Sequence, residues 1–257
     1  MTERLFIAAQ SNWSVNAVAG GKYSEPYSYM EGYYRAGEKL AAFAINERRN
    51  MDVLFFPICF NYRHYVELTL KHLILAAEKY YFALNEIQSG STGSKLNQSF
   101  LIPKKRKFWC FVPNSKIHAR ILWKSNPKKK IKLNSTHSLK VLLQWLIDRL
   151  KTISNQKFDN DIRNTILELG KMDPKGQSFR YGLLKNGVFS IESQRHFNLE
   201  VIYKNMEQVY YYLSGIDIFL TERTEQAMDY LSIIQEEIRE LENDALPEIM
   251  DFSDYDY

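Results

Sequence analysis

The stretch Asn61–Leu75, NYRHYVELTLKHLIL, has the spacing of apolar residues that predicts an α-helix. Its apolar side chains form two stripes on nearly opposite sides of that helix. A helix that is apolar on two sides lies buried between neighbours. We therefore expect it to be the central helix of a mainly α-helical protein. The first stripe holds Val66, Leu70, Leu73 and, just beyond the stretch, Ala77, and the second holds Leu68 and Leu75.

Four ionisable residues, Arg63, His64, Glu67 and Lys71, occupy the seam between these two stripes. Arg63 and Glu67 form an i,i+4 pair, as do Glu67 and Lys71, and such a pair stabilises an exposed helix by only about 0.2–0.5 kcal/mol. In a half-buried seam, the loss of either pair would cost more. Two interpretations stay open at this point: a structural ladder of charges, or a functional site.

Most of the remaining sequence also has helical periodicity. The Gly- and Ser-rich segment Asn85–Ser99 predicts a linker, and Met172–Ser190 predicts a loop with two turns, Asp-Pro-Lys-Gly and Lys-Asn-Gly. We expect a single domain over residues 1–257, with its core at about 27–220. The predicted helices are Tyr27–Asn50, Pro57 to about Ile87, Asn134–Leu150, Asp159–Leu169, about Glu192–Thr221, and about Glu222–Asp244.

The segment Ile102–Leu133 has a different pattern, in which apolar residues alternate with others on both sides of a Pro-Asn-Ser-Lys turn. This pattern predicts a β-hairpin inserted at about residues 100–133. Basic clusters flank it, and aromatic residues such as Trp109 and Trp123 lie between them, a combination typical of single-stranded nucleic-acid binding. The basic residues expected to contact nucleic acid are Lys104, Lys105, Arg106, Lys107, Arg120, Lys128, Lys129 and Lys130.

The net charge of +4 conceals a strong asymmetry along the chain. Residues Ile87–Ile147 contain no acid and thirteen Lys or Arg, whereas Thr221–Tyr257 contain twelve acids and two arginines. One interpretation is that the basic middle and the acidic end neutralise each other within the fold or a dimer. The other is that the middle binds an anionic partner and the acidic helix and tail, residues 222–257, compete with it.

Composition excludes several classes of protein. No apolar run reaches the roughly 18 residues that span a bilayer, and the N-terminal MTERLFIAAQ is unlike a secretory leader, so we expect a soluble, cytoplasmic protein. Cys59 and Cys110 predict two reduced, partly buried thiols. No Cys and His cluster has zinc spacing, and Gly90-Ser-Thr-Gly93 does not have the spacing of a P-loop. We expect neither a metal nor a cofactor.

Three motifs occur in order along the chain: YRHYVELTLKHLI, THSLKVLL and SFRYGLLKNG, the last followed by a long predicted helix. Together they resemble the HEPN superfamily of α-helical domains. The first motif is also similar to a group of uncharacterised bacterial proteins with a Tyr-Arg-His-x-x-Glu-Leu-x-Leu-Lys signature. The resemblance covers about Tyr27 to Leu220, and it rests on Val66–Lys71, Thr136–Leu139 and Arg180–Tyr181.

This resemblance implies a HEPN-like antiparallel helix bundle that carries the hairpin insertion and a C-terminal helix. Many HEPN proteins are metal-independent ribonucleases or components of toxin–antitoxin and phage-defence systems, and they act as dimers. Their hallmark is an Arg-x4–6-His motif. None of the five histidines here has an arginine at that distance upstream, so the standard nuclease site is absent. Fold-level analogy alone does not transfer the activity.

The sequence therefore leaves two main hypotheses and a third, the binding of a nucleotide by Arg180 and Lys71 without hydrolysis. The first is an HEPN-like protein of a bacterial antiphage defence or toxin–antitoxin system that handles RNA or nucleotides, with a non-standard metal-independent ribonuclease as its enzymatic form. The second is a non-catalytic adaptor that binds a protein from the same operon, or nucleic acid, through its basic insert. Either would form a homodimer. The predicted catalytic residues are Arg63, His64 and Glu67, and the predicted substrate-binding residues are Lys71, His137, Arg180 and Tyr181, although a scaffold role is favoured for Glu67 and Lys71.

Overall fold

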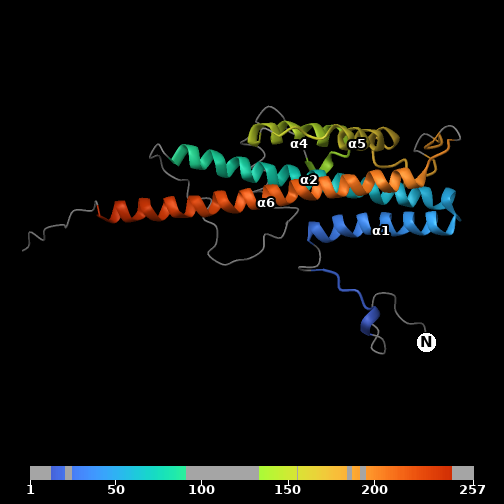
Figure 1. The fold of residues 1–257 in the computed structure, drawn as a ribbon, viewed down its shortest axis with the longest axis horizontal. Coiled ribbons are helices and arrows are strands. Elements are labelled where there is room, and N and C mark those ends of the chain that lie inside the picture. The colour runs from blue at the N-terminus through green and yellow to red at the C-terminus, as the bar shows by residue number, and fades with distance from the viewer. Residues whose placement is uncertain are drawn as a thin grey trace, which may run out of the picture.

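A computed structural model describes residues 13–20, 25–90, 133–154, 156–183, 187–191 and 195–244. Within these ranges the chain is a bundle of α-helices and contains no β-strand, apart from an isolated bridge between Leu183 and Phe189 (Figure 1). The prediction of a mainly α-helical bundle is confirmed, and the hairpin predicted at about 100–133 lies outside the described residues. The helices are α1 (Pro26–Glu47), α2 (Met51–Gly90), α4 (Leu139–Ile153), α5 (Asn160–Met172) and α6 (Leu199–Asp244).

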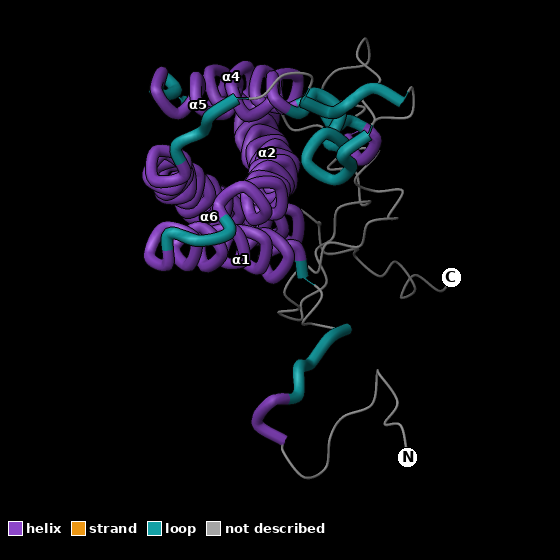
Figure 2. Tube along the Cα trace, turned by 90° about the vertical axis from the view of Figure 1, so that its right-hand side faces the viewer, coloured by secondary structure: helices purple, strands orange, loops and turns teal. Residues whose placement is uncertain are grey.

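Helix α2 is the centre of the bundle, as its two apolar stripes predict. In an end-on view it lies between α1 on one side and the layer of α4 and α5 on the other, with α6 alongside (Figure 2). Val66, Leu70 and Leu73 have no exposed surface, and Leu68 and Leu75 on the opposite stripe pack partly buried against the same core. The hydrophobic effect therefore fixes α2 in place from several sides.

The directions of the helices follow from their connections and contacts. The short turn Arg48–Asn50, with left-handed backbone at both ends, reverses the chain so that α1 and α2 run antiparallel. Helices α2 and α6 run parallel, because Phe55 stacks on Phe197 near their starts and Tyr80 contacts Phe219 further along. This pair departs from the antiparallel arrangement that we expected. The chain passes through α4 and α5 between them, so no short turn forces them to alternate.

Several helix boundaries differ from the predictions: α4 begins at Leu139 and not at Asn134, and α6 begins at Leu199 and not at about Glu192. Helix α2 begins at Met51, six residues before the predicted start, and Pro57 lies inside it. Proline removes one helical hydrogen bond, that to the carbonyl of Val53, and Val53 is exposed, so water can satisfy that carbonyl. At the other end of the chain, the two predicted helices are one helix, α6, because neither glycine nor proline interrupts the sequence between them.

Other predicted elements agree closely with the structure. The predicted helix at Asp159–Leu169 corresponds to α5, for which the Asp159 carboxylate caps the first turn by accepting from Asp161 N and Ile162 N.

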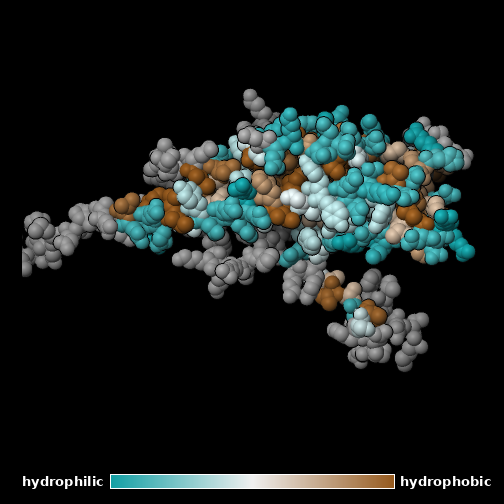
Figure 3. All heavy atoms as spheres, in the orientation of Figure 1, coloured by the Kyte–Doolittle hydropathy of each residue, from teal (hydrophilic) through white to brown (hydrophobic). Residues whose placement is uncertain are grey.

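The polar surface visible in Figure 3 covers much of the bundle, with apolar patches toward the end where α6 extends past the other helices. None of the helices in the described ranges combines the length and hydropathy needed to cross a membrane.

Candidate functional site

A buried arginine joins three parts of the bundle. Arg63, on α2, is only 2% exposed, and its guanidinium donates to the Glu67 carboxylate at 2.6 Å. It also donates through Nε to the main-chain carbonyl of Asp173 at 3.1 Å and through Nη2 to that of His137 at 2.5 Å. The planar, always-charged guanidinium can bond in several directions at once. Arg63 thereby ties α2 to the segment before α4 and to the turn after α5.

The turn after α5 is built around Asp173, which is fully buried. Its Oδ1 accepts from the backbone N–H groups of Gln177 and Ser178 at 2.7 and 2.9 Å. Its Oδ2 lies 3.2 Å from Arg63 Nε, an ionic contact without hydrogen-bond geometry. Gly176 has a φ of +72°, and a Cβ there would lie 3.3 Å from the Arg63 Cζ. The turn therefore needs glycine for its backbone conformation and for the close approach of the guanidinium.

The Glu67 carboxylate is the centre of a second set of contacts. Its Oε1 accepts from the Lys71 ammonium at 2.7 Å and pairs with His137 Nδ1 at 2.9 Å, and only 4% of the Glu67 side chain is exposed. Burial alone would raise the pKa of the Glu67 carboxyl, but hydrogen bonds from Lys71, Arg63 and His137 outweigh it and hold that pKa below its usual range. Glu67 is therefore an ionised, acceptor-only group at neutral pH.

His137 is oriented by this carboxylate. Because an ionised carboxylate can only accept, the contact places a proton on His137 Nδ1, and in the neutral imidazole Nε2 then carries the free lone pair. The side chain is 54% exposed, so a ligand can reach the imidazole ring. The sequence predicted His137 within the first turn of a helix, but it lies before Ser138, the N-cap residue of α4. Its environment is set by Glu67 and not by a helix dipole.

His64 lies among aromatic rings on the same side of α2. Its ring meets Tyr33 edge to face, at a centroid distance of 4.4 Å, and stacks with Phe60 at 5.7 Å. Burial lowers the pKa of His64, and although Glu67 opposes the shift, the nearby positive charges of Arg180, Arg63 and Lys71 add to it. His64 is therefore a neutral, half-buried ring at pH 7. Arg180 is exposed, and its guanidinium lies 5.2 Å from the centre of the Phe60 ring.

The structure thus brings Arg63, Glu67, Lys71 and His137 into direct contact, with His64 and Arg180 linked to each other through Phe60. Tyr181 is exposed on the surface. A catalytic residue must touch its substrate. Arg63 and Glu67 are buried, and their burial does not favour a catalytic role. The catalytic assignment of these residues stays a prediction. The scaffold role favoured for Glu67 agrees with its bond to His137. The predicted nucleic-acid contacts lie outside the described residues: Lys104, Lys105, Arg106, Lys107, Arg120, Lys128, Lys129 and Lys130.

Sequence reasoning missed several residues of this region. Asp173 belongs to a turn that the sequence identified, but no local signal shows that its carboxylate approaches an arginine 110 positions earlier. Tyr33 and Phe60, which hold His64, resemble ordinary core aromatics in the sequence. A second buried pair, Glu78 with Arg149 at 2.7 Å, was also missed, and it fixes α4 against α2 on the same side as His137.

The described part of the chain contains neither a cluster of metal ligands nor a thiol that is easily ionised. No group of His, Cys, Asp and Glu side chains within it is arranged to hold a metal ion. Cys59 is buried in the core, and burial raises the pKa of its thiol to about 12. A thiol with so high a pKa is not ionised at neutral pH and is a poor nucleophile.

The lowered pKa of Glu67 predicts a loss of stability in acid. Because the folded state holds this proton less tightly than the unfolded chain, stability is complete above the unfolded pKa of about 4.3 and falls as the pH drops through the lower folded pKa. Urea titrations between pH 6 and pH 3 should show a shallower acid dependence for Glu67→Gln than for the wild type. Glu236→Gln, in an exposed pair with Arg239, should follow the wild type, and equal slopes in all three proteins would contradict this assignment.

Comparisons of the chain with family models, with curated proteins and with solved structures find no match. The fold and the contacts described above are therefore the basis for assigning a function.

Proposed function

We propose that this chain is an HEPN-like protein that binds RNA or nucleotides at the surface formed by His137 and Lys71. The observation that supports this most directly is that both side chains bind the same oxygen of the buried Glu67 carboxylate, at 2.9 and 2.7 Å. The imidazole and the ammonium must then lie side by side. One presents a free ring nitrogen and the other a positive charge, which is a suitable pair for a phosphate group.

The same pair would supply a base and a cation for metal-independent cleavage of RNA. A carboxylate-oriented imidazole is a general base, and His137 Nε2 would take the proton from a 2′-hydroxyl. The 2′-oxygen would then bond to phosphorus to give a 2′,3′-cyclic phosphate, and the 5′-oxygen, whose bond to phosphorus breaks, would take a proton from water. The Lys71 ammonium would stabilise the negative charge that develops on the phosphorus oxygens. In this form of the proposal, Arg63 and Glu67 act by positioning His137. The setting implied by the resemblance, a dimeric component of a bacterial defence or toxin–antitoxin system, is part of the proposal.

The alternative is a non-catalytic adaptor, which one observation favours. The last part of α6 carries the exposed apolar residues Ile233 and Leu241 among acidic side chains, beyond most of the bundle (Figure 1). An apolar stripe with charged flanks is a common surface for a partner helix. Binding of that kind would depend little on salt, whereas binding of RNA phosphates weakens steeply as salt concentration rises.

The test compares RNA binding and cleavage by the wild type, Lys71→Met and His137→Ala, using labelled tRNA and mRNA. Lys71→Met should reduce the slope of log K against log salt by about 0.7, the contribution of one contact to single-stranded nucleic acid. If the wild type cleaves RNA, His137→Ala should slow cleavage by about 10²-fold or more.

His196→Ala is the matched control, because it removes an exposed histidine from the segment before α6. It should behave as the wild type, and Lys71→Arg should keep the salt slope because it keeps the charge. Circular dichroism checks that each variant is folded. The proposal fails if the wild type binds no RNA, or if Lys71→Met and His137→Ala both behave as His196→Ala does.

A further inference from the structure

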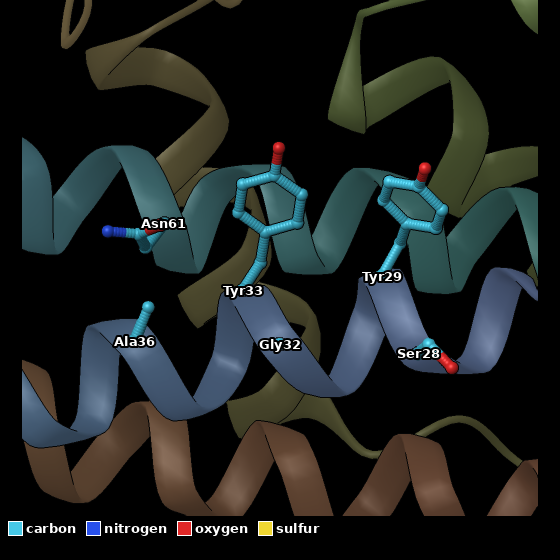
Figure 4. Close-up of a pocket in the computed structure, with 6 residues that line it drawn as sticks. All are labelled: Ser28, Tyr29, Gly32, Tyr33, Ala36 and Asn61. Carbon is cyan, nitrogen blue, oxygen red and sulfur yellow. The ribbon is translucent and has the colours of Figure 1, made fainter. Parts of the chain in front are cut away.

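A shallow groove lies on the surface where α1 meets α2. Its volume is about 250 Å³, which is below the roughly 300–1,000 Å³ of sites for drug-sized ligands. Such a groove has room for a single planar ring system and not for a whole nucleotide. Figure 4 shows its lining residues, which are Ser28, Tyr29, Gly32, Tyr33 and Ala36 of α1 and Asn61 of α2.

Two tyrosines give the groove its walls. Tyr29 and Tyr33 rise from the same side of α1, one helical turn apart, with Gly32 between them along the helix (Figure 4). Tyr29 is 52% exposed, although a large aromatic side chain normally gains stability from burial. Exposed aromatic rings of this kind are stacking platforms in proteins that bind single-stranded nucleic acids, because every base has a π-face.

Gly32 keeps the floor of the groove open. A Cβ at this position would meet nothing within 4 Å, so packing inside the chain does not require glycine there. Gly37, one and a half turns further along α1, differs, because a Cβ there would lie 2.9 Å from the buried Tyr62 ring. Glycine weakens the interior of a helix relative to alanine. Packing among the described residues therefore does not explain this glycine, whereas a ligand in the groove would occupy the space that a side chain would otherwise fill.

Asn61 supplies a polar group at the edge of the groove. Its amide nitrogen donates to the main-chain carbonyl of Pro57 at 2.7 Å. Because a carbonyl can only accept, this contact identifies the nitrogen end of the amide and leaves its second N–H and its carbonyl oxygen for a ligand. An amide with one donor and one acceptor matches the edges of nucleobases.

The groove adjoins an aromatic cluster that leads to Arg180, one of the predicted substrate-binding residues. Tyr33, which forms one wall, contacts His64 at 4.4 Å between ring centroids, and His64 stacks on Phe60. The exposed Arg180 guanidinium lies over that same Phe60 ring. A base in the groove would therefore have a cation close by for its phosphate.

We propose that this groove holds one unpaired base of a bound RNA, stacked against Tyr29 and Tyr33 and hydrogen-bonded by Asn61. The inference rests on the proposed function and extends it, because it specifies single-stranded RNA as the class of ligand. The phosphates contribute affinity that depends on salt, and the groove contributes affinity that depends on the presence of a base.

The test uses two probes, a short oligoadenylate and an abasic oligomer of the same length, which has the same phosphates and no bases. The wild type should bind the oligoadenylate about tenfold more tightly than the abasic oligomer, a preference at the lower end of the range for base stacking. Gly32→Leu fills the groove and should remove that preference while leaving the abasic affinity unchanged. Gly215→Leu is the matched control, since Gly215 is also an exposed helical glycine with open space around its Cβ position.

Tyr29→Ser is a second variant, which removes one exposed wall without filling the groove, and it should also reduce the preference for oligoadenylate. The inference is overturned if the wild type shows no preference, or if Gly32→Leu keeps it. It is also overturned if Gly32→Leu converts a dimer into a monomer in sedimentation, because the groove is then a contact between two copies. If the wild type binds the two probes equally tightly, only the base subsite is refuted. If the wild type binds neither probe, the proposed function is refuted as well.

Discussion

Replacing Arg63 by methionine should lower the free energy of unfolding by about 3–5 kcal/mol, the cost of removing one partner from a buried ion pair. The substitution leaves the carboxylates of Glu67 and Asp173 buried with less positive charge beside them. It also leaves two main-chain carbonyls, those of His137 and Asp173, without their donor. Urea denaturation followed by circular dichroism at pH 7 measures the change.

Arg239→Met is the matched control for this prediction. Arg239 also pairs with a glutamate on its own helix, Glu236 at 2.8 Å, but its side chain is 57% exposed. An exposed pair contributes about 0–1 kcal/mol, because water screens the charges and both side chains lose freedom. If Arg63→Met and Arg239→Met destabilise the protein equally, the central role of the Arg63 guanidinium is wrong.

Asp173→Ala should have an effect of similar size, about 3–5 kcal/mol. The substitution removes the acceptor of two backbone N–H groups, those of Gln177 and Ser178, and a negative charge next to Arg63. Asp173→Asn keeps an acceptor oxygen for the turn while it removes the charge, so it should cost less than half as much. The measurement is again urea denaturation, together with the rate of proteolysis in the turn after α5.

A double-mutant cycle separates the two contributions at this contact. Arg63→Met and Asp173→Ala remove the two sides of one contact, so their effects should not add, and the coupling energy should be about 0.5–3 kcal/mol. Strict additivity would mean that the ionic contact at 3.2 Å carries no energy of its own. In that case Asp173 would serve only as the cap of its turn.

These stability predictions bear on the proposed function, because the buried charges position the exposed His137 and the partly buried Lys71. Glu67 is held by Arg63 and in turn holds His137 and Lys71. A substitution of Arg63 that leaves the protein folded should therefore also weaken the proposed binding of RNA. Groups in contact with a ligand depend in this way on the residues that orient them.

The local spacing of apolar residues was sufficient to predict the helices and to predict that α2 is the central one. The two apolar stripes of α2 predict a helix that is covered from several sides, and the structure confirms it with Val66, Leu70 and Leu73 fully buried. The spacing of Glu67 and Lys71 likewise predicts their contact, since residues four apart lie on the same side of a helix. Helix ends were less predictable, because α2 tolerates Pro57 near its start and α6 continues without a break.

Only the tertiary structure decided which charges are buried and which are exposed. Arg63 and His64 are adjacent in the sequence, yet one is sealed among carbonyls and carboxylates while the other lies between aromatic rings. The partners that make this difference come from the segment before α4, from the turn after α5 and from α1, far away in the chain. The sequence by itself determined an α-helical bundle with a charged seam on its central helix. The packing of the bundle determined what the seam does, because burial depends on neighbours that no local spacing encodes.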